Sequence, residues 1–255
     1  MAPMSVDVMR RRRVPWDWTD ILIFVGVMLL LPAGTDDQGR LLTLAGQAIR
    51  FGGYVTHLVD TGLQPSSRNA LESFTGQTFF YAVALAVVLL LVIGRRHATV
   101  RDLGWRSVAT RWLLLAAPLT VVALIVAAVL GAISAALFPG VSNAQCTAVR
   151  AEYGHVILIA IPAVSVVAPL VEETIFRGFI FGWLSRQLPW PAAAVLSALI
   201  FAGAHFIKLL LLPLFGVGLL LAYLYHRTGS LWPGVVVHGL FNLVGIVQIL
   251  NATSC

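Results

Sequence analysis

The stretch Val171-Glu172-Glu173-Thr174-Ile175-Phe176-Arg177-Gly178 lies in the apolar half of a very hydrophobic chain. An ionised side chain at membrane depth costs from ~2.5 to over 10 kcal/mol, so such groups face a protein interior or a wet cavity and indicate a functional site by default. If the stretch is helical, Glu173 and Arg177 stand at i and i+4, where their side chains can meet and neutralise one another. Glu172 is rotated away from that pair by about 100°. We therefore expect Glu173 to be structural and Glu172 to be available for chemistry.

The composition around this stretch is that of a membrane protein. Of the 255 residues, 59% are hydrophobic and only 11% are charged, whereas a soluble domain carries about a quarter charged residues. Several apolar runs approach twenty residues, the length of a membrane-spanning helix. The net charge of +6 comes from basic residues between these runs, so it indicates orientation rather than nucleic-acid binding. The sequence predicts an all-α, polytopic transmembrane helical bundle.

About seven segments are expected to cross the membrane. They are residues 18–33, 78–94, 112–138, 155–187, 190–207, 209–225 and 231–250. The fourth contains Pro162 and Pro169, which should kink or restart the helix before the glutamates. Residues 139–154 are expected to form a short polar loop. Residues 41–63 are interrupted by polar groups and fit an amphipathic or surface-lying segment better than a span. An eighth span results only if they cross.

The arginines give the expected orientation. Residues 10–13 are all arginine, and five more arginines follow the second span, at positions 95, 96, 101, 106 and 111. The two groups lie on the same side only if residues 41–63 do not cross, and the positive-inside rule assigns that side to the cytoplasm. All seven tryptophans lie at or near span ends. Trp16 and Trp18 are therefore expected to anchor the first span at the membrane interface.

Three segments carry polar residues at helical-turn spacing in apolar surroundings. They are Glu172-Glu173-x-x-x-Arg177, Phe201-x-x-x-His205 and His238-x-x-x-Asn242. The outer residues of each motif share one helix face. At ~1.5 Å per residue, Glu172 and His205 each lie roughly 22 Å from the inner boundary, and His238 and Asn242 lie about 15–20 Å in. The three motifs can therefore meet in one layer inside the membrane.

Each residue also has an ordinary structural interpretation. A single histidine on an apolar helix is usually a hydrogen-bonded packing residue, and an asparagine in a span usually joins helices. Phe201 alone is packing, and Gly178-x-x-x-Gly182 is a small-residue face of the kind that allows close helix packing. Several ionisable groups and a carboxamide at one depth are costly, however, and packing does not explain them together. The combination indicates a reactive or transport site.

The three motifs, in this order on separate membrane helices, resemble the CPBP intramembrane protease family, which comprises CAAX prenyl proteases and bacteriocin-processing or immunity (Abi) proteins. The similarity covers about residues 160–245, and Leu103-Gly104-Trp105-Arg106 also resembles a pattern common in that family. We expect residues 1–255 to form a single membrane domain. Its N-terminal spans, over residues 1–100, carry no usable resemblance and are treated as variable, and its catalytic core covers about residues 155–250.

The resemblance implies a membrane-embedded endopeptidase. By the motif match, Glu172 is the general base that activates water, and His205 positions that water or shares its proton. His238 and Asn242 stabilise the oxyanion of the tetrahedral intermediate. Peptide hydrolysis does require a base, a held water and donors aimed at developing negative charge. Three further residues are expected to support the site structurally: Glu173, Arg177 and Phe201.

The resemblance leaves zinc open. The family is commonly labelled metalloprotease, and Glu172, His205 and His238 offer one carboxylate and two imidazoles, a set that zinc accepts. The sequence has no His-Glu-x-x-His helix, and a glutamate and histidine site without metal would suffice. The cofactor is therefore expected to be either zinc or none.

Two other functions compete with proteolysis. A proton-coupled transporter would use the same buried groups as a relay, although the sequence shows no inverted repeat and its polar groups cluster in the C-terminal half. A non-catalytic membrane immunity or scaffold protein would keep the fold without the reaction. For the protease, the expected partners are the lipid bilayer and a membrane-associated protein or peptide, of CAAX or bacteriocin type, and no nucleic acid. We expect an integral protein of a bacterial plasma membrane with a cytoplasmic N-terminus.

Overall fold

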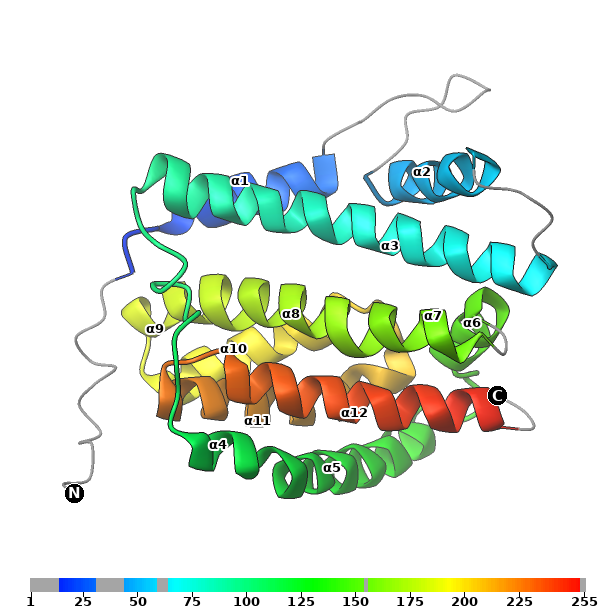
Figure 1. Cartoon of the computed structure of the whole chain (residues 1–255). Coiled ribbons are helices and arrows are strands. Elements are labelled where there is room, and N and C mark those ends of the chain that lie inside the picture. Colours follow the sequence, from blue (N-terminus) through cyan, green and yellow to red (C-terminus); the bar gives the residue numbers. More distant parts are fainter. Residues whose placement is uncertain (1–13, 31–43, 59–63, 154–155, 253–255) are drawn as a thin grey trace.

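The computed structural model describes residues 14–30, 44–58, 64–153 and 156–252 of the chain. Within these ranges the regular structure is entirely helical. Figure 1 shows helices stacked in layers, with α1 to α3 above the long segment that contains α8, and with α4 and α5 on the opposite side. One end of the bundle holds α9 and the C-terminal end of α3, and the other end holds α6 and the C-terminal end of α12.

The N-terminal half provides the upper layer and one side of the bundle. Its elements are α1 (Trp18–Leu30), α2 (Leu44–Leu58), α3 (Pro65–Leu89), the π-helical η2 (Leu90–Arg95), α4 (Thr110–Leu114), α5 (Ala116–Leu137) and α6 (Ala144–Tyr153). The C-terminal half forms the centre. Its elements are α7 (Ile157–Ile161), η3 (Pro162–Val167), α8 (Ala168–Glu173), η4 (Thr174–Phe181), α9 (Gly182–Gln187), α10 (Trp190–Gly203), η5 (Lys208–Leu210), α11 (Leu211–Thr228) and α12 (Trp232–Asn251).

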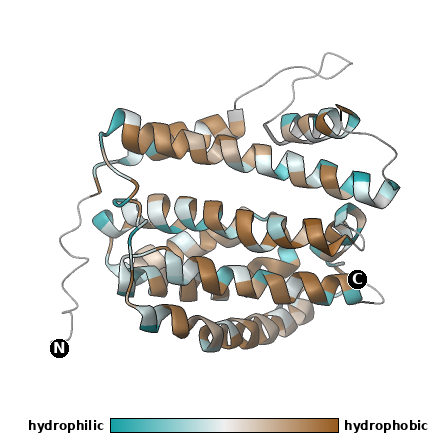
Figure 2. Ribbon diagram, viewed as in Figure 1, coloured by the Kyte–Doolittle hydropathy of each residue, from teal (hydrophilic) through white to brown (hydrophobic). Residues whose placement is uncertain are grey.

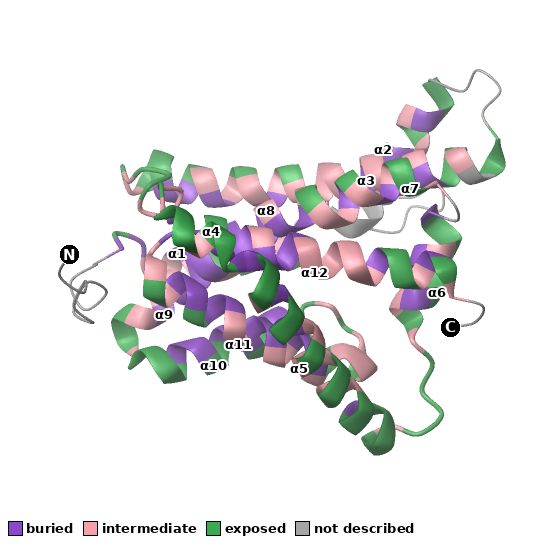
Figure 3. Ribbon diagram, turned by 60° about the horizontal axis from the view of Figure 1, so that its bottom comes forward, coloured by how far each residue is buried: buried purple, intermediate pink, exposed green. Residues whose placement is uncertain are grey.

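The predicted fold class is confirmed. Among the described residues, five helices are long and apolar enough to cross a membrane: Ser67–Arg95, Ala116–Leu137, Ile157–Gln187, Lys208–Thr228 and Trp232–Asn251. Two shorter apolar helices, Trp18–Leu29 and Trp190–Gly203, lie where the first and fifth spans were predicted. Figure 3 shows exposed residues along most of α5 and buried residues concentrated in α8, α11 and α12. Of the three motif-bearing helices, α8 and α12 therefore occupy the interior of the bundle, whereas α10 is partly exposed.

The helix of the second span begins earlier in the chain than predicted. Its helix, α3, starts at Pro65 rather than at residue 78, with proline in the first turn, where its missing N–H costs nothing. Figure 2 shows that hydropathy rises along α3. A span boundary placed where the sequence becomes apolar therefore leaves out the polar first turns of the helix. These turns are covered by α2, which packs so closely that a Cβ at Gly52 would lie 2.3 Å from the backbone oxygen of Glu72. The amphipathic segment expected within residues 41–63 is thus a helix packed on α3.

Of the kink or restart expected at the prolines of the fourth span, the restart does not occur. Its helix runs unbroken from Ile157 to Gln187. Two stretches, η3 and η4, are π-helical, and η3 begins at Pro162. A proline removes one backbone donor and crowds the preceding turn, and a local i→i+5 widening can accommodate this without ending the helix.

The π-helical stretches offer backbone carbonyls to donors from other elements. The carboxamide of Asn242 donates to the carbonyl of Val164 at 2.9 Å, and the indole of Trp16 donates to that of Phe179 at 2.9 Å. The hydroxyl of Ser197 likewise donates to a carbonyl of η4, that of Phe176, at 3.1 Å. Irregular helix geometry thus ties the central segment to α12, α10 and the N-terminal residues.

Three other predicted boundaries shift. The fifth span ends at Gly203, four residues before the predicted end, and the sixth ends at Thr228. The loop expected at residues 139–154 contains the helix α6, which buries Val149 and Tyr153. Its ten residues are too polar for a hydropathy signal, and they fold because their apolar face packs on α3, α7 and α12.

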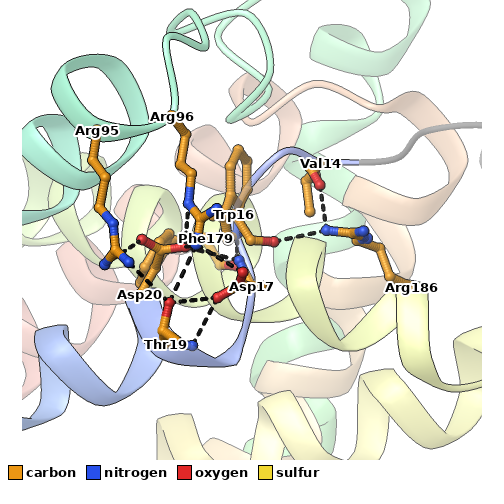
Figure 4. A network of polar contacts seen from close by, with 9 residues as sticks. All are labelled: Val14, Trp16, Asp17, Thr19, Asp20, Arg95, Arg96, Phe179 and Arg186. Atoms are coloured by element: carbon orange, nitrogen blue, oxygen red, sulfur yellow. Dashed lines mark hydrogen bonds and ion pairs between the residues drawn. The ribbon is translucent and has the colours of Figure 1, made fainter.

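The first described residues pack into the protein core rather than lying at the membrane interface. Trp16 is fully buried and stacks on Phe179 with ring centroids 5.8 Å apart, whereas Trp18 is 61% exposed. The prediction that Trp16 anchors the first span at the interface is therefore wrong. In Figure 4, Arg186 reaches the backbone of this segment and donates to the carbonyl of Trp16 at 2.8 Å.

Candidate active site

The two adjacent glutamates of α8 have different surroundings. Glu173 accepts from the guanidinium of Arg177 at 2.8 Å, the i, i+4 pair that the spacing predicted. The same carboxylate oxygen accepts from Nδ1 of His238 at 3.0 Å. Glu173 therefore joins the first motif to the third. It also approaches α12 closely, since a Cβ at Gly234 would lie 2.9 Å from its other oxygen.

Arg177 is fully buried, and its guanidinium contacts residues of three other elements although its Nε has no hydrogen-bond partner. Besides Glu173, it contacts the backbone carbonyl of Gly218 on α11 at 3.3 Å. Its guanidinium carbon lies 4.4 Å from the centroid of the Phe201 ring, a cation–π contact. The pair forms although η4 is π-helical in this region.

Phe201 contacts both histidines of the site. Its ring makes edge contacts with His205 and His238, at centroid distances of 5.0 and 5.7 Å. A third edge contact, with Phe176 at 5.1 Å, connects α10 to η4. Phe201 is completely buried, so it holds the imidazoles from behind rather than facing a substrate.

Both imidazoles use Nδ1 for a protein hydrogen bond. In His205, Nδ1 lies 2.9 Å from the carbonyl of Phe201, and in His238 it lies 3.0 Å from the carboxylate of Glu173. A carbonyl or carboxylate oxygen only accepts, so Nδ1 carries the proton in each ring. In the neutral ring the Nε2 atom is then an acceptor. Nε2 of His238 lies 3.8 Å from Oε2 of Glu172.

The other oxygen of Glu172 contacts a residue that sequence reasoning missed. Oε1 accepts a hydrogen bond from the hydroxyl of Tyr81, on α3. Tyr81 lies among the N-terminal spans, which carry no motif, and nothing in its sequence surroundings sets it apart from an ordinary span residue. The contact joins residues 91 positions apart, so only the packing of α3 against α8 brings it about.

Asn242 is partly engaged elsewhere. One N–H of its carboxamide donates to Val164, as described above, which leaves one N–H for another acceptor. The family resemblance implied that this side chain stabilises the oxyanion. The structure thus gives it an additional structural contact with η3.

One large cavity brings the predicted catalytic residues together. It has a volume of about 960 Å³, and Glu172, His205, His238 and Asn242 all line it. The walls are mainly apolar and come from α1, α3, α5, α6 and the central helices. The three residues predicted to support the site lie outside the lining: Glu173, Arg177 and Phe201.

The described side chains form no preassembled metal site. Within the described ranges, no three His, Cys, Asp or Glu side chains are grouped as ligands for one ion. Nε2 of His238 and Oε2 of Glu172 stand 3.8 Å apart, close to the separation of two ligands on one tetrahedral zinc with bonds of about 2.0–2.2 Å, but no third ligand is grouped with them among the described residues. We therefore derive the chemistry from the protein groups.

Comparison with known proteins locates the similarity in the same part of the chain. Residues 154–244, which hold all three motifs, match the family model described as Type II CAAX prenyl endopeptidase Rce1-like. The putative membrane peptidase YdiL of Bacillus subtilis is 26% identical over 190 residues, which cover 74% of this chain and 78% of that protein. The membrane-embedded CAAX protease MroQ of Staphylococcus aureus is 37% identical over 95 residues, or 34% of this chain and 38% of that protein. No solved structure is significantly similar.

Proposed function

We propose that this chain is a membrane-embedded endopeptidase of the Rce1-like CAAX type, whose family model residues 154–244 match. Glu172 is the base of a peptide hydrolysis carried out inside the bilayer. The observation that carries the proposal is the arrangement around Glu172. One oxygen of this carboxylate is held by Tyr81, and the other faces Nε2 of His238 across 3.8 Å in the wall of the cavity.

That 3.8 Å separation suits a bridging water molecule. Polar atoms further apart than about 3.5 Å are commonly linked by a water that hydrogen-bonds to both. In the proposed step, Oε2 of Glu172 takes a proton from this water while the water oxygen bonds to the scissile carbonyl carbon. The proton then passes to the leaving nitrogen as the carbon–nitrogen bond breaks. His238, oriented by Glu173, holds the water in place.

The remaining two cavity residues are assigned to the substrate. Asn242 keeps one N–H that can donate to the developing oxyanion, in line with its predicted role. His205, with its proton on Nδ1, offers Nε2 as an acceptor for the N–H of the scissile peptide. This differs from the predicted role of His205 in holding the water, because the imidazole beside Glu172 is that of His238.

The substrate proposed is a membrane-associated protein or peptide, and the geometry favours access from one end of the bundle. Residues of α6 and the C-terminal end of α12 line the cavity, including Gln145 and Gln248. The opposite end is filled by the core around Trp16, Phe179 and Phe181, and it carries Arg95, Arg96 and Arg186. By the positive-inside rule the arginine end is cytoplasmic. We therefore propose a cytoplasmic N-terminus and a substrate that reaches the cavity from the α6 end.

Glu172→Gln tests the proposal. It should lower the cleavage rate by at least about 100-fold, because a carboxamide cannot act as a base, while the folded protein accumulates normally. Cleaved membrane peptides are mapped by mass spectrometry in cells with and without the variant. Glu72→Gln, the same change at an α3 glutamate outside the cavity lining, should cleave like the wild type.

The outcomes separate the competing functions. Undiminished cleavage by Glu172→Gln would refute the proposal. A scaffold would keep its cellular function in the variant, and a carrier would lose flux without a cleaved product ever appearing. The strong chelator 1,10-phenanthroline should leave the purified wild-type rate unchanged if the protein groups alone activate the water.

A further inference from the structure

Tyr81 connects the part of the chain outside the matched segment to the reacting carboxylate. Its hydroxyl donates to Oε1 of Glu172, and both residues line the cavity. Tyr81 belongs to α3, which contacts both α8 and η4, whereas the motifs all lie within residues 154–244. The helix that carries Tyr81 is therefore part of the site.

A second polar contact lies beside Tyr81 on the same helix. The hydroxyl of Tyr153 on α6 donates to Oε1 of Gln77 at 3.0 Å. Gln77 lies one turn before Tyr81 on α3, so the two side chains share one helix face. Both residues line the cavity, as does Tyr153.

The hydroxyl of Tyr81 occupies one oxygen of the carboxylate and leaves the other to face His238. Oε1 of Glu172 is occupied by Tyr81, while Oε2 faces Nε2 of His238 at 3.8 Å. A carboxylate bound at only one oxygen by a fixed donor cannot exchange its two oxygens by rotation without breaking that bond. Building on the function proposed above, we propose that Tyr81 is a positioning residue that selects Oε2 of Glu172 as the atom that takes the proton from water.

A purely structural role for Tyr81 would give different results. Its neighbour Phe80 also lines the cavity but has no hydroxyl. If the ring of Tyr81 only shaped the wall, deleting its hydroxyl would change substrate affinity or nothing at all. If the hydroxyl positions the base, the deletion lowers the rate of the chemical step at saturating substrate.

Tyr81→Phe is the first test. Loss of a hydrogen bond to a charged group should lower kcat roughly 10- to 100-fold, with KM within about twofold of the wild type. Tyr54→Phe removes a hydroxyl from an exposed tyrosine on α2 and should leave both constants unchanged. A kcat of Tyr81→Phe within twofold of the wild type, or a loss confined to KM, would overturn the proposal.

Chemical rescue distinguishes the effect of losing the Tyr81 hydroxyl from the effect of losing the volume of its ring. Tyr81→Ala should be inactive, and added phenol should restore part of kcat by supplying a hydroxyl in the vacated volume. Benzene occupies apolar cavities of this kind as readily but has no donor, so it should not restore the rate. Equal rescue by benzene and phenol would mean that Tyr81 only fills space, and would overturn the proposal.

If Glu172→Gln still cleaves, the proposed function itself fails. If Glu172→Gln is inactive but Tyr81→Phe is fully active, only the present inference fails.

Discussion

Gly178 and Gly182 lie on the face of the central helix on which other parts of the chain pack most closely. A Cβ at Gly178 would lie 2.6 Å from the backbone oxygen of Leu103, and one at Gly182 would lie 3.3 Å from the ring of Trp16. The small-residue face predicted from Gly178-x-x-x-Gly182 is therefore used, but by a loop and the N-terminal segment rather than by a neighbouring span. The carbonyl of Leu103 also accepts from the hydroxyl of Tyr225 at 3.1 Å, which limits its freedom to move.

Gly178→Ala should destabilise the protein by about 1–3 kcal/mol, because the added methyl group meets a backbone oxygen that cannot simply rotate away. The measurement is thermal unfolding in detergent. Gly26→Ala, in α1, is the matched control: no heavy atom lies within 4 Å of its added Cβ, so it should be neutral or slightly stabilising. An unchanged melting temperature for Gly178→Ala would show that the loop at Leu103 is not held as described.

At the scale of elements, residues 14–20 form an N-terminal clamp across the arginine end of the bundle. Oδ1 of Asp17 accepts from the backbone and hydroxyl of Thr19, and the backbone of Asp17 donates in return to the carboxylate of Asp20, as in a capping box. Figure 4 shows Arg95 and Arg96, at the end of η2, reaching the same carboxylates. The clamp thus joins the start of α1 to the end of η2.

The clamp predicts a stability change in acid. Hydrogen bonds from Thr19, supported by Arg96, lower the pKa of Asp17 from 3.8 to about 2. This pKa is lower in the folded protein than in the unfolded chain. The contribution of Asp17 to the stability of the folded protein is therefore fully present above about pH 4 and is lost as the pH falls towards 2. The melting temperature of the wild type in detergent should fall over this interval by more than that of Asp17→Asn. Equal losses in the two proteins would rule out this contribution.

At the scale of the whole molecule, the two ends of the bundle differ in charge and in access to the cavity. The arginine end is closed by the N-terminal clamp and by the loop of residues 99–109, where Trp105 donates to Thr174 at 3.1 Å and Leu231 donates to the carbonyl of Gly104 at 3.0 Å. The segment Leu103-Gly104-Trp105-Arg106, which resembled a family pattern, therefore docks on the helices of the site. The α6 end contributes the polar part of the cavity wall.

Single serine-to-cysteine changes test the proposed orientation. Ser142 precedes α6 and Ser107 lies in the arginine-end loop, and both are exposed. In intact cells a membrane-impermeant maleimide should label Ser142→Cys, whereas Ser107→Cys should be labelled only after permeabilisation. The wild-type chain, whose Cys146 is disulfide-bonded, serves as the control for background labelling. The reverse pattern would place the α6 end in the cytoplasm and contradict the proposed route of access.

Local patterns in the sequence determined the helical membrane character and much of the candidate site. Hydropathy over about twenty residues predicts spans because the bilayer has a fixed thickness. The i, i+4 spacing of Glu173 and Arg177 predicts their ion pair because both lie on one helix, where rotation per residue is set by backbone hydrogen bonds. The common depth of the three motifs, by the same arithmetic, correctly indicated that Glu172, His205, His238 and Asn242 line one cavity.

Only the tertiary structure decided which partners meet between helices. The contact of Tyr81 with Glu172, the burial of Trp16 and the bond from Asn242 to Val164 each join residues far apart in the chain. Hydropathy does not distinguish a side chain that faces lipid from one that faces the protein core, since both surroundings are apolar. Helix spacing does not say which face of another helix will be opposite. These choices depend on how the helices pack as solid bodies, and that is a property of the whole fold rather than of any one stretch.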